Sequence, residues 1–305
     1  MNSLFKQADI LPSLPEVYMR VNSLIENERV TASEIGGAVQ TDPALTARIL
    51  KLVNSAYYGL RNPVTSIPHV VSLLGREQLQ QVLLGSVLVG VCKDYDVEGF
   101  PMKEFWQHSI KTAIIARHLA MQNAQVIDHE VFFTAGLLHD IGWLVIAKVN
   151  PDAYAHISEL VREEGVETTE VETEILGVTH VEIGIELLEK WGIPGMVTQC
   201  VKKHHEIDHI GPFAIETSII YLANQLSRLV LEEGEDFEEI ADLLDILDTI
   251  PNWDKSKCTS EQISIACKLA NEQWLEVMVS LGMLESDKKD SQPDPSKKYT
   301  ELDIR

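Results

Sequence analysis

Apolar residues recur every three to four positions along almost the whole chain. One run shows the pattern clearly, with apolar side chains at Ala44, Leu45, Ala47, Ile49, Leu50, Leu52 and Val53. This is the period of a helix that buries one broad stripe. No segment keeps a period of two between turn signals, so a β-sheet is not expected. The spacing therefore predicts an all-α fold class.

Cap signals place the starts of two helices. Thr31 to Glu34 supplies a cap before an apolar run, and Asp42 precedes Pro43, a residue suited to the first helical turn. Gly59 is expected to stop the second of these helices. Further helices are expected at residues 67–74, 78–91, 102–120, 130–148, 151–164, 167–175, 179–191, 194–204, 213–231 and 260–281.

Charge and hydropathy limit the partners and the location of the chain. The chain has 25 Lys and Arg against 47 Asp and Glu, a net charge of −22 that repels a phosphate backbone, so nucleic acid is not an expected partner. The apolar runs fall short of the roughly 20 residues of a membrane helix. The first ten residues lack the apolar core and cleavage site of a secretory signal. We expect a cytoplasmic protein without membrane contact.

Metal-ligand residues recur in order through the second half of the chain. These residues are His108, His139, Asp140, His180, His204 and His205. A divalent ion needs imidazole nitrogens and carboxylate oxygens from several elements, and one bridging Asp can serve two ions. Glu104 lies one helical turn before His108 on the same face and could add an oxygen ligand.

The simpler alternative is that each histidine is a hydrogen-bonded surface or core residue. For any single histidine this alternative is favoured. It is retained for His69, His118, His129, His156 and His209. The six ordered residues taken together favour one shared site, because independent structural histidines have no reason to follow this order.

The same residues carry a family resemblance. Their order resembles the HD superfamily of metal-dependent phosphohydrolases. In the first half, LPSLP at 11–15, DPALTARILKLVNSAYYG at 42–59 and the segment 67–79 resemble the signature of the HDOD family, the HD-related output domain. The resemblance covers residues 11–209 and implies an HD-like helical bundle with an additional N-terminal helical bundle packed against it.

A change in composition at residues 93–101, where Lys, Asp, Glu, Gly and Pro interrupt the apolar pattern, marks a seam. We expect four segments along the chain. They are an N-terminal helical half at 1–95, an HD-like core at 96–231, C-terminal helices at 232–284 and a flexible tail at 285–305.

The resemblance also implies a ligand set. The six ordered residues match positions where the related HD-GYP phosphodiesterases keep metal ligands, and Glu104 matches a carboxylate in some of them. Two divalent ions are implied, with Fe, Mn, Ni and Zn all compatible. Asn224 stands where a late helix supplies a closing aspartate, and Trp143 stands where a lysine contacts substrate phosphate. No Gly-Tyr-Pro loop follows His205.

Three functions remain open. HDOD domains are regarded as signalling modules that lost phosphohydrolase activity, so the favoured hypothesis is a bacterial signal-transduction output protein that binds a partner protein. Its metal site would have little or no hydrolase activity. The alternative is a phosphohydrolase that acts on a nucleotide or cyclic dinucleotide. A third possibility is a bound iron that senses oxygen or redox state. No catalytic residue is assigned.

Polar members of the 42–59 signature are interpreted as structural. Asp42 is expected to cap a helix, Asn54 and Ser55 to end one, and Tyr57 to pack in the core.

Overall fold

The computed structural model describes residues 14–92, 97, 99–126, 128–193, 195–206, 209–233 and 240–284. Within these ranges every regular element is a helix, so the predicted all-α class is confirmed. The elements of the first half are α1 (Glu16–Glu26), α2 (Ala32–Val39), α3 (Pro43–Val53), α4 (Ile67–Leu74) and α5 (Arg76–Cys92). Those of the second half are α6 (Met102–Gln122), α7 (Glu130–Leu138), α8 (Gly142–Val149), α9 (Pro151–Glu164), α10 (Thr168–Leu176), α11 (His180–Lys190), α12 (Gly195–Lys203), α13 (Ala214–Glu233), α14 (Ile240–Thr249), η2 (Trp253–Ser256) and α15 (Ser260–Leu281).

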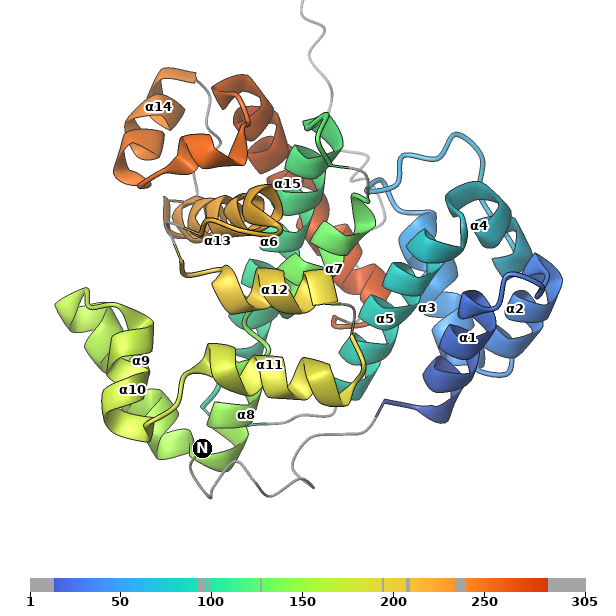
Figure 1. The fold of residues 1–305 in the computed structure, drawn as a ribbon, viewed down its shortest axis with the longest axis horizontal. Helices are drawn as coiled ribbons and strands as arrows, with labels where there is room; N and C mark the ends of the chain where they lie inside the picture. The colour runs from blue at the N-terminus through green and yellow to red at the C-terminus, as the bar shows by residue number, and fades with distance from the viewer. Residues whose placement is uncertain are drawn as a thin grey trace, which may run out of the picture.

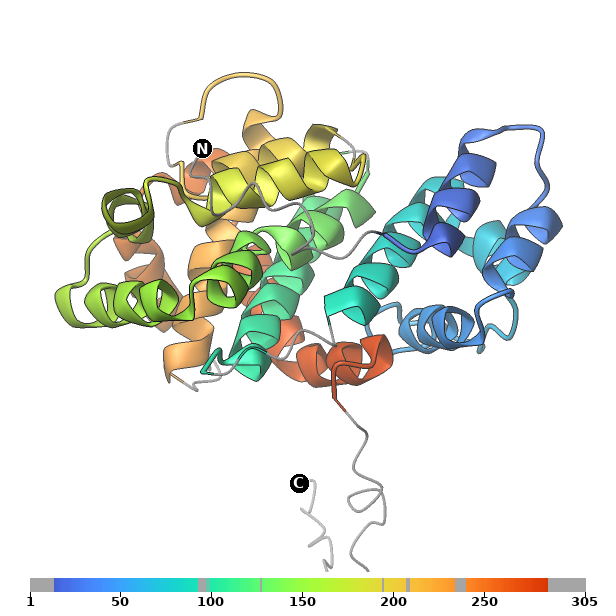
Figure 2. The same cartoon turned by 90° about the horizontal axis from the view of Figure 1, so that it is seen from below.

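Helices α1 to α5 form a bundle at one side of the molecule, and α6 to α15 form the other part (Figure 1). The view from below shows the same division (Figure 2). The two parts share one apolar core, and Leu137 of α7 lies directly against Gly85 of α5. The second bundle contacts the first again where α15 packs on α3. An HD-like bundle with an N-terminal helical bundle packed against it is therefore confirmed.

The 42–59 signature is built as the sequence predicts. Asp42 accepts a hydrogen bond from the backbone N–H of Leu45 at 2.9 Å, which caps α3. The side chain of Asn54 pairs with the backbone N–H and carbonyl of Val64, both at 2.7 Å, and so fixes the loop after α3. Tyr57 is buried against Phe133 of α7. These contacts confirm the structural interpretation of these residues.

One expected helix is two helices. The sequence pattern predicted a single helix at 130–148, but the chain turns at 139–141 between α7 and α8. Gly142 explains the tight crossing that follows, because a Cβ there would lie 1.9 Å from the carbonyl oxygen of His180. The turn is what places His139 and Asp140 together at the end of α7.

The stretch Glu130–Val149 also corrects an expectation about apolar runs. By length and hydropathy it could span a membrane, although no such stretch was expected. However, 94% of its window is buried within the fold, so it is a core segment of the bundle. Two helices, α1 and α14, were not individually expected. The predicted tail at 285–305 and most of the predicted seam lie outside the described residues, and the segment limits stay predictions.

Candidate metal centre

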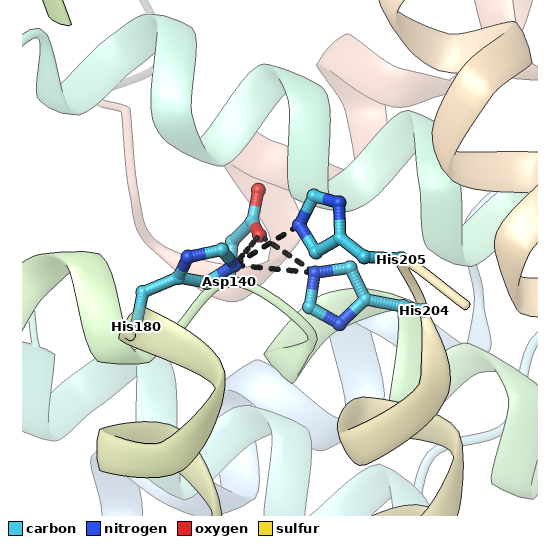
Figure 3. A group of neighbouring side chains, drawn as sticks. All are labelled: Asp140, His180, His204 and His205. Atoms are coloured by element: carbon cyan, nitrogen blue, oxygen red, sulfur yellow. Dashed lines mark hydrogen bonds and ion pairs between the residues drawn. The ribbon is translucent and has the colours of Figure 1, made fainter. Parts of the chain in front are cut away.

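Six of the eight predicted ligand residues come together between α6, α7, α8, α11, α12 and α13. His108 projects from α6, and His139 and Asp140 occupy the turn between α7 and α8. His180 is the first residue of α11, and His204 and His205 follow directly after α12. The imidazoles of His180, His204 and His205 surround the carboxylate of Asp140 (Figure 3).

Asp140 divides the six residues into two groups and belongs to both. Its Oδ2 lies 3.1 Å from Nε2 of His139 and 3.5 Å from Nε2 of His108. Its Oδ1 lies 3.3 Å from Nε2 of both His180 and His204. His205 joins the second group through its Nε2, 3.2 Å from Nε2 of His180. Each carboxylate oxygen therefore faces its own set of imidazoles, the arrangement of a bridging ligand.

The second ring nitrogen of four histidines is held by the surrounding protein. Nδ1 of His139 contacts the carbonyl oxygen of Gly136 at 2.7 Å, and Nδ1 of His204 contacts that of Val201 at 2.6 Å. Because a carbonyl oxygen only accepts, both Nδ1 atoms carry the proton. Nδ1 of His180 donates in the same way to the carboxylate of Glu172, at 2.6 Å.

Nδ1 of the fourth histidine, His108, contacts a hydroxyl group instead of a carbonyl or carboxylate oxygen. The Ser227 hydroxyl lies 3.0 Å from Nδ1 of His108 and donates to the carbonyl of Asn224 at 2.9 Å. Because the hydroxyl proton is donated to Asn224, the hydroxyl oxygen accepts the hydrogen bond from Nδ1–H of His108. With Nδ1 protonated, each of the four rings in its neutral form presents the Nε2 lone pair to the centre, which is how metal-binding histidines are oriented by their surroundings.

Facing lone pairs cannot hydrogen-bond with one another. Nε2 of His108 and His139 are 3.1 Å apart, and Nε2 of His180 and His204 are 3.3 Å apart. Two ligand nitrogens about 2.1 Å from one ion, at the angles of octahedral or tetrahedral geometry, lie about 3.0–3.4 Å from each other. The spacing and the donor set of each group therefore suit a divalent ion.

Burial and charge set the protonation of the centre. Burial lowers the pKa of His108 and of His204 to about 4, so both rings are neutral at pH 7. Burial acts the same way on His180, but hydrogen bonds to Asp140 and Glu172 outweigh it and raise its pKa to about 9. An ion that binds Nε2 of His180 must displace a proton, so acidic solution weakens metal binding.

The family follows from the sequence match over this fold. The HDOD domain model matches residues 11–207 of the chain. The chain belongs to the HDOD family. The match covers the signature at 42–59 and the centre from His108 to His205.

Individual proteins resemble this HDOD protein over most of its length. An uncharacterised protein of Treponema pallidum (strain Nichols) is 28% identical over 207 residues, 68% of this chain and 40% of that protein. The chain thus spans less than half the length of this relative. A crystal structure of a candidate phosphohydrolase from Shewanella amazonensis SB2B is 27% identical with a TM-score of 0.74, covering 92% of this chain and 98% of that one. A candidate signal transduction protein from Marinobacter aquaeolei VT8 shares the fold, with 23% identity and a TM-score of 0.66 over 92% and 64% of the two chains.

The two remaining predicted ligands lie differently in the HDOD protein. Glu104 is exposed on the first turn of α6 and stands outside both groups, so the structure does not bring it to the centre. Asn224 is fully buried on α13, and both atoms of its amide lack a hydrogen-bond partner. It lies one turn before Ser227, which contacts His108. A buried amide oxygen without a donor at this position is available to a metal ion.

Sequence reasoning missed the residues that orient the ligands. Glu172 of α10 is fully buried and holds both the ring and the backbone N–H of His180, but it has no motif of its own. Trp143 was recognised as a replacement for a lysine, and the structure shows that its ring stacks on His180 at 5.2 Å and 16°. Only the tertiary fold brings these side chains to His180.

Replacing Glu172 by Gln is expected to weaken metal binding about tenfold to hundredfold. The neutral amide keeps the size of the side chain but withdraws the charge that fixes the His180 tautomer. Competition with a chelator measures the metal affinity. Glu170→Gln, an exposed position on the same helix, is the matched control. Equal affinities for the two variants would contradict the orienting role of Glu172.

Proposed function

We propose that this HDOD protein is a signal-transduction output protein that binds two divalent metal ions at its HD centre and has little or no hydrolase activity. The observation that carries the proposal is the division of the site by Asp140, with one oxygen toward His108 and His139 and the other toward His180 and His204. His108, His139 and Oδ2 would hold one ion. His180, His204, His205 and Oδ1 would hold the other. Such ions, when bound, supply Lewis-acid chemistry toward a phosphoryl oxygen.

Two substitutions support weak catalysis. Asn224 offers a neutral amide oxygen where related phosphodiesterases place an aspartate, so an ion that it helps to hold is bound less tightly. Trp143 is committed to stacking on His180 and has no cationic group for a substrate phosphate. Both changes leave metal binding possible while removing groups that would align a phosphoester for attack.

We propose that the protein transmits its signal by binding a partner protein in the cytoplasm of a bacterium. The net charge of −22 supports a protein partner over nucleic acid, because it repels polyanions at long range. The similarity to a candidate signal transduction protein from Marinobacter aquaeolei VT8 extends over the fold alone.

A metal-dependent phosphohydrolase acting on a nucleotide or cyclic dinucleotide is the second candidate function. It is favoured by the complete set of His and Asp residues in the two groups and by the likeness to the Shewanella amazonensis protein. Both candidate functions require bound metal. They differ in whether the metal-loaded protein hydrolyses a phosphoester.

The test combines metal content with activity. Elemental analysis of protein purified without added metal is expected to find about two ions per chain. The protein is then loaded anaerobically with Mn²⁺ or Fe²⁺ and assayed on cyclic and linear phosphodiesters, with turnover expected well below about 1 s⁻¹.

Asp140→Ala serves as the control for metal-dependent activity. Turnover near about 1 s⁻¹ that disappears in this variant would establish the hydrolase instead. Protein that binds no divalent ion would contradict both candidates.

A further inference from the structure

Most of the ligand residues at the centre are buried, but two of its histidines keep part of their side chains exposed. The side chains of His139, His180 and His204 are fully buried. His108 keeps 12% of its side chain exposed, and His205 is also partly exposed. His108 and His205 are therefore the histidines of the centre that solvent reaches.

Arg228 is a cation on α13, the helix whose Ser227 contacts His108. It follows Ser227 directly and is partly exposed. Burial is the main reason that the pKa values of His108 and His205 are low, and the positive charge of Arg228 lowers both further. Arg228 also lies one helical turn after Asn224, whose buried amide has no hydrogen-bond partner, so the two residues share one side of α13.

Two other cations near the centre are already engaged. Lys203 pairs with both carboxylate oxygens of Glu206, at 2.6 and 2.7 Å. Lys111 is buried and donates to Asn271 at 2.6 Å. Among the described residues, Arg228 has no carboxylate within ion-pair distance, although the chain carries 47 acidic residues. Its guanidinium remains available to an anion from solution.

A guanidinium suits one class of anion in particular. Its planar fork donates two parallel N–H bonds, which match the oxygens of a phosphate group. A phosphate held between Arg228 and two divalent ions would have its negative charge neutralised from both sides. An apolar or cationic ligand would gain nothing from this arrangement.

We propose that Arg228 anchors the phosphate group of a small ligand at the open side of the metal centre. The inference rests on the proposed metal site and names the ligand class of that site. The cation comes from α13 and not from the position of Trp143, where the resemblance places a lysine. The ligand is bound and sensed without rapid cleavage, which suits a signalling protein.

The experiment uses full-length protein loaded with Mn²⁺ and freed of excess metal. Inorganic phosphate is the first probe and a nucleoside monophosphate the second, and ³¹P relaxation reports how close each phosphorus lies to the paramagnetic ion. Arg228→Gln is expected to weaken binding about tenfold to hundredfold with the Mn²⁺ content unchanged. Tighter binding of the monophosphate would identify an ester as the ligand, and tighter binding of inorganic phosphate would identify the free anion.

Two further variants make the result specific to this guanidinium. Arg228→Lys keeps the charge without the fork and is expected to bind with intermediate affinity. Arg162→Gln removes an exposed arginine of α9 and is expected to bind phosphate as the wild type does. Wild-type protein that binds no Mn²⁺ would remove the proposed metal site. Mn²⁺-loaded protein whose phosphate binding is absent, or is equal in wild type and Arg228→Gln, would overturn the role of Arg228 alone.

Discussion

Asp140→Ala protein is expected to bind divalent metal more than about a hundredfold more weakly than wild type. Asp140 is the residue that the two ligand groups share, so its loss removes an oxygen from both. It also leaves imidazole lone pairs facing one another, with no carboxylate to balance an ion. Removal of a single histidine would affect one group, whereas this variant affects both.

Elemental analysis after dialysis measures the metal content, and thermal unfolding with and without added Mn²⁺ measures the linked stability. Wild type is expected to melt at a higher temperature with metal, and Asp140→Ala at the same temperature in both conditions. Asp152→Ala, an exposed aspartate at the start of α9, is the matched control and should retain the metal. Equal metal content in Asp140→Ala and wild type would show that Asp140 does not bridge the two groups.

Most of the fold could be predicted because its signals are local. The caps at Thr31 and Asp42 and the apolar stripe of α3 depend on residues within a few positions of each other. The site could be predicted from the order of its histidines, since that order reflects which helices meet. The break at 139–141 was missed because the apolar pattern runs through it, and only the crossing of α8 over His180 at Gly142 explains it.

The supporting residues of the site could not be predicted for a related reason. Glu172 precedes His180 by eight residues, and Ser227 follows His108 by 119, so no spacing rule joins them. Arg228 carried a weak signal, because it lies one helical turn after Asn224 on α13. That signal has a meaning only once α13 is known to pack beside α6.

A buried ion pair within the second bundle is contacted by two tyrosines of the first bundle. Arg117 of α6 contacts Glu130 of α7 through Nε and Nη2, both 2.6 Å from Oε1. The two residues are 8% and 1% exposed. Tyr58, from the signature of the first bundle, donates its hydroxyl to the other carboxylate oxygen at 3.0 Å. The guanidinium also lies over the ring of Tyr57, 4.7 Å from its centroid. The tyrosine pair of the signature therefore contacts α6, which carries His108, and α7, which ends directly before His139.

Replacing Arg117 by Met is expected to lower the free energy of unfolding by about 3–5 kcal/mol, because Glu130 is left as an uncompensated buried charge. The double variant Arg117→Met, Glu130→Leu removes that charge and is expected to recover at least half of the loss. Urea denaturation of the metal-loaded protein measures both. Arg162→Met breaks a 3.9 Å pair whose side chains are 75% and 63% exposed, so it should change stability by less than about 0.5 kcal/mol. A double variant no more stable than Arg117→Met would show that packing of the arginine on Tyr57, rather than neutralisation of Glu130, holds the bundles together.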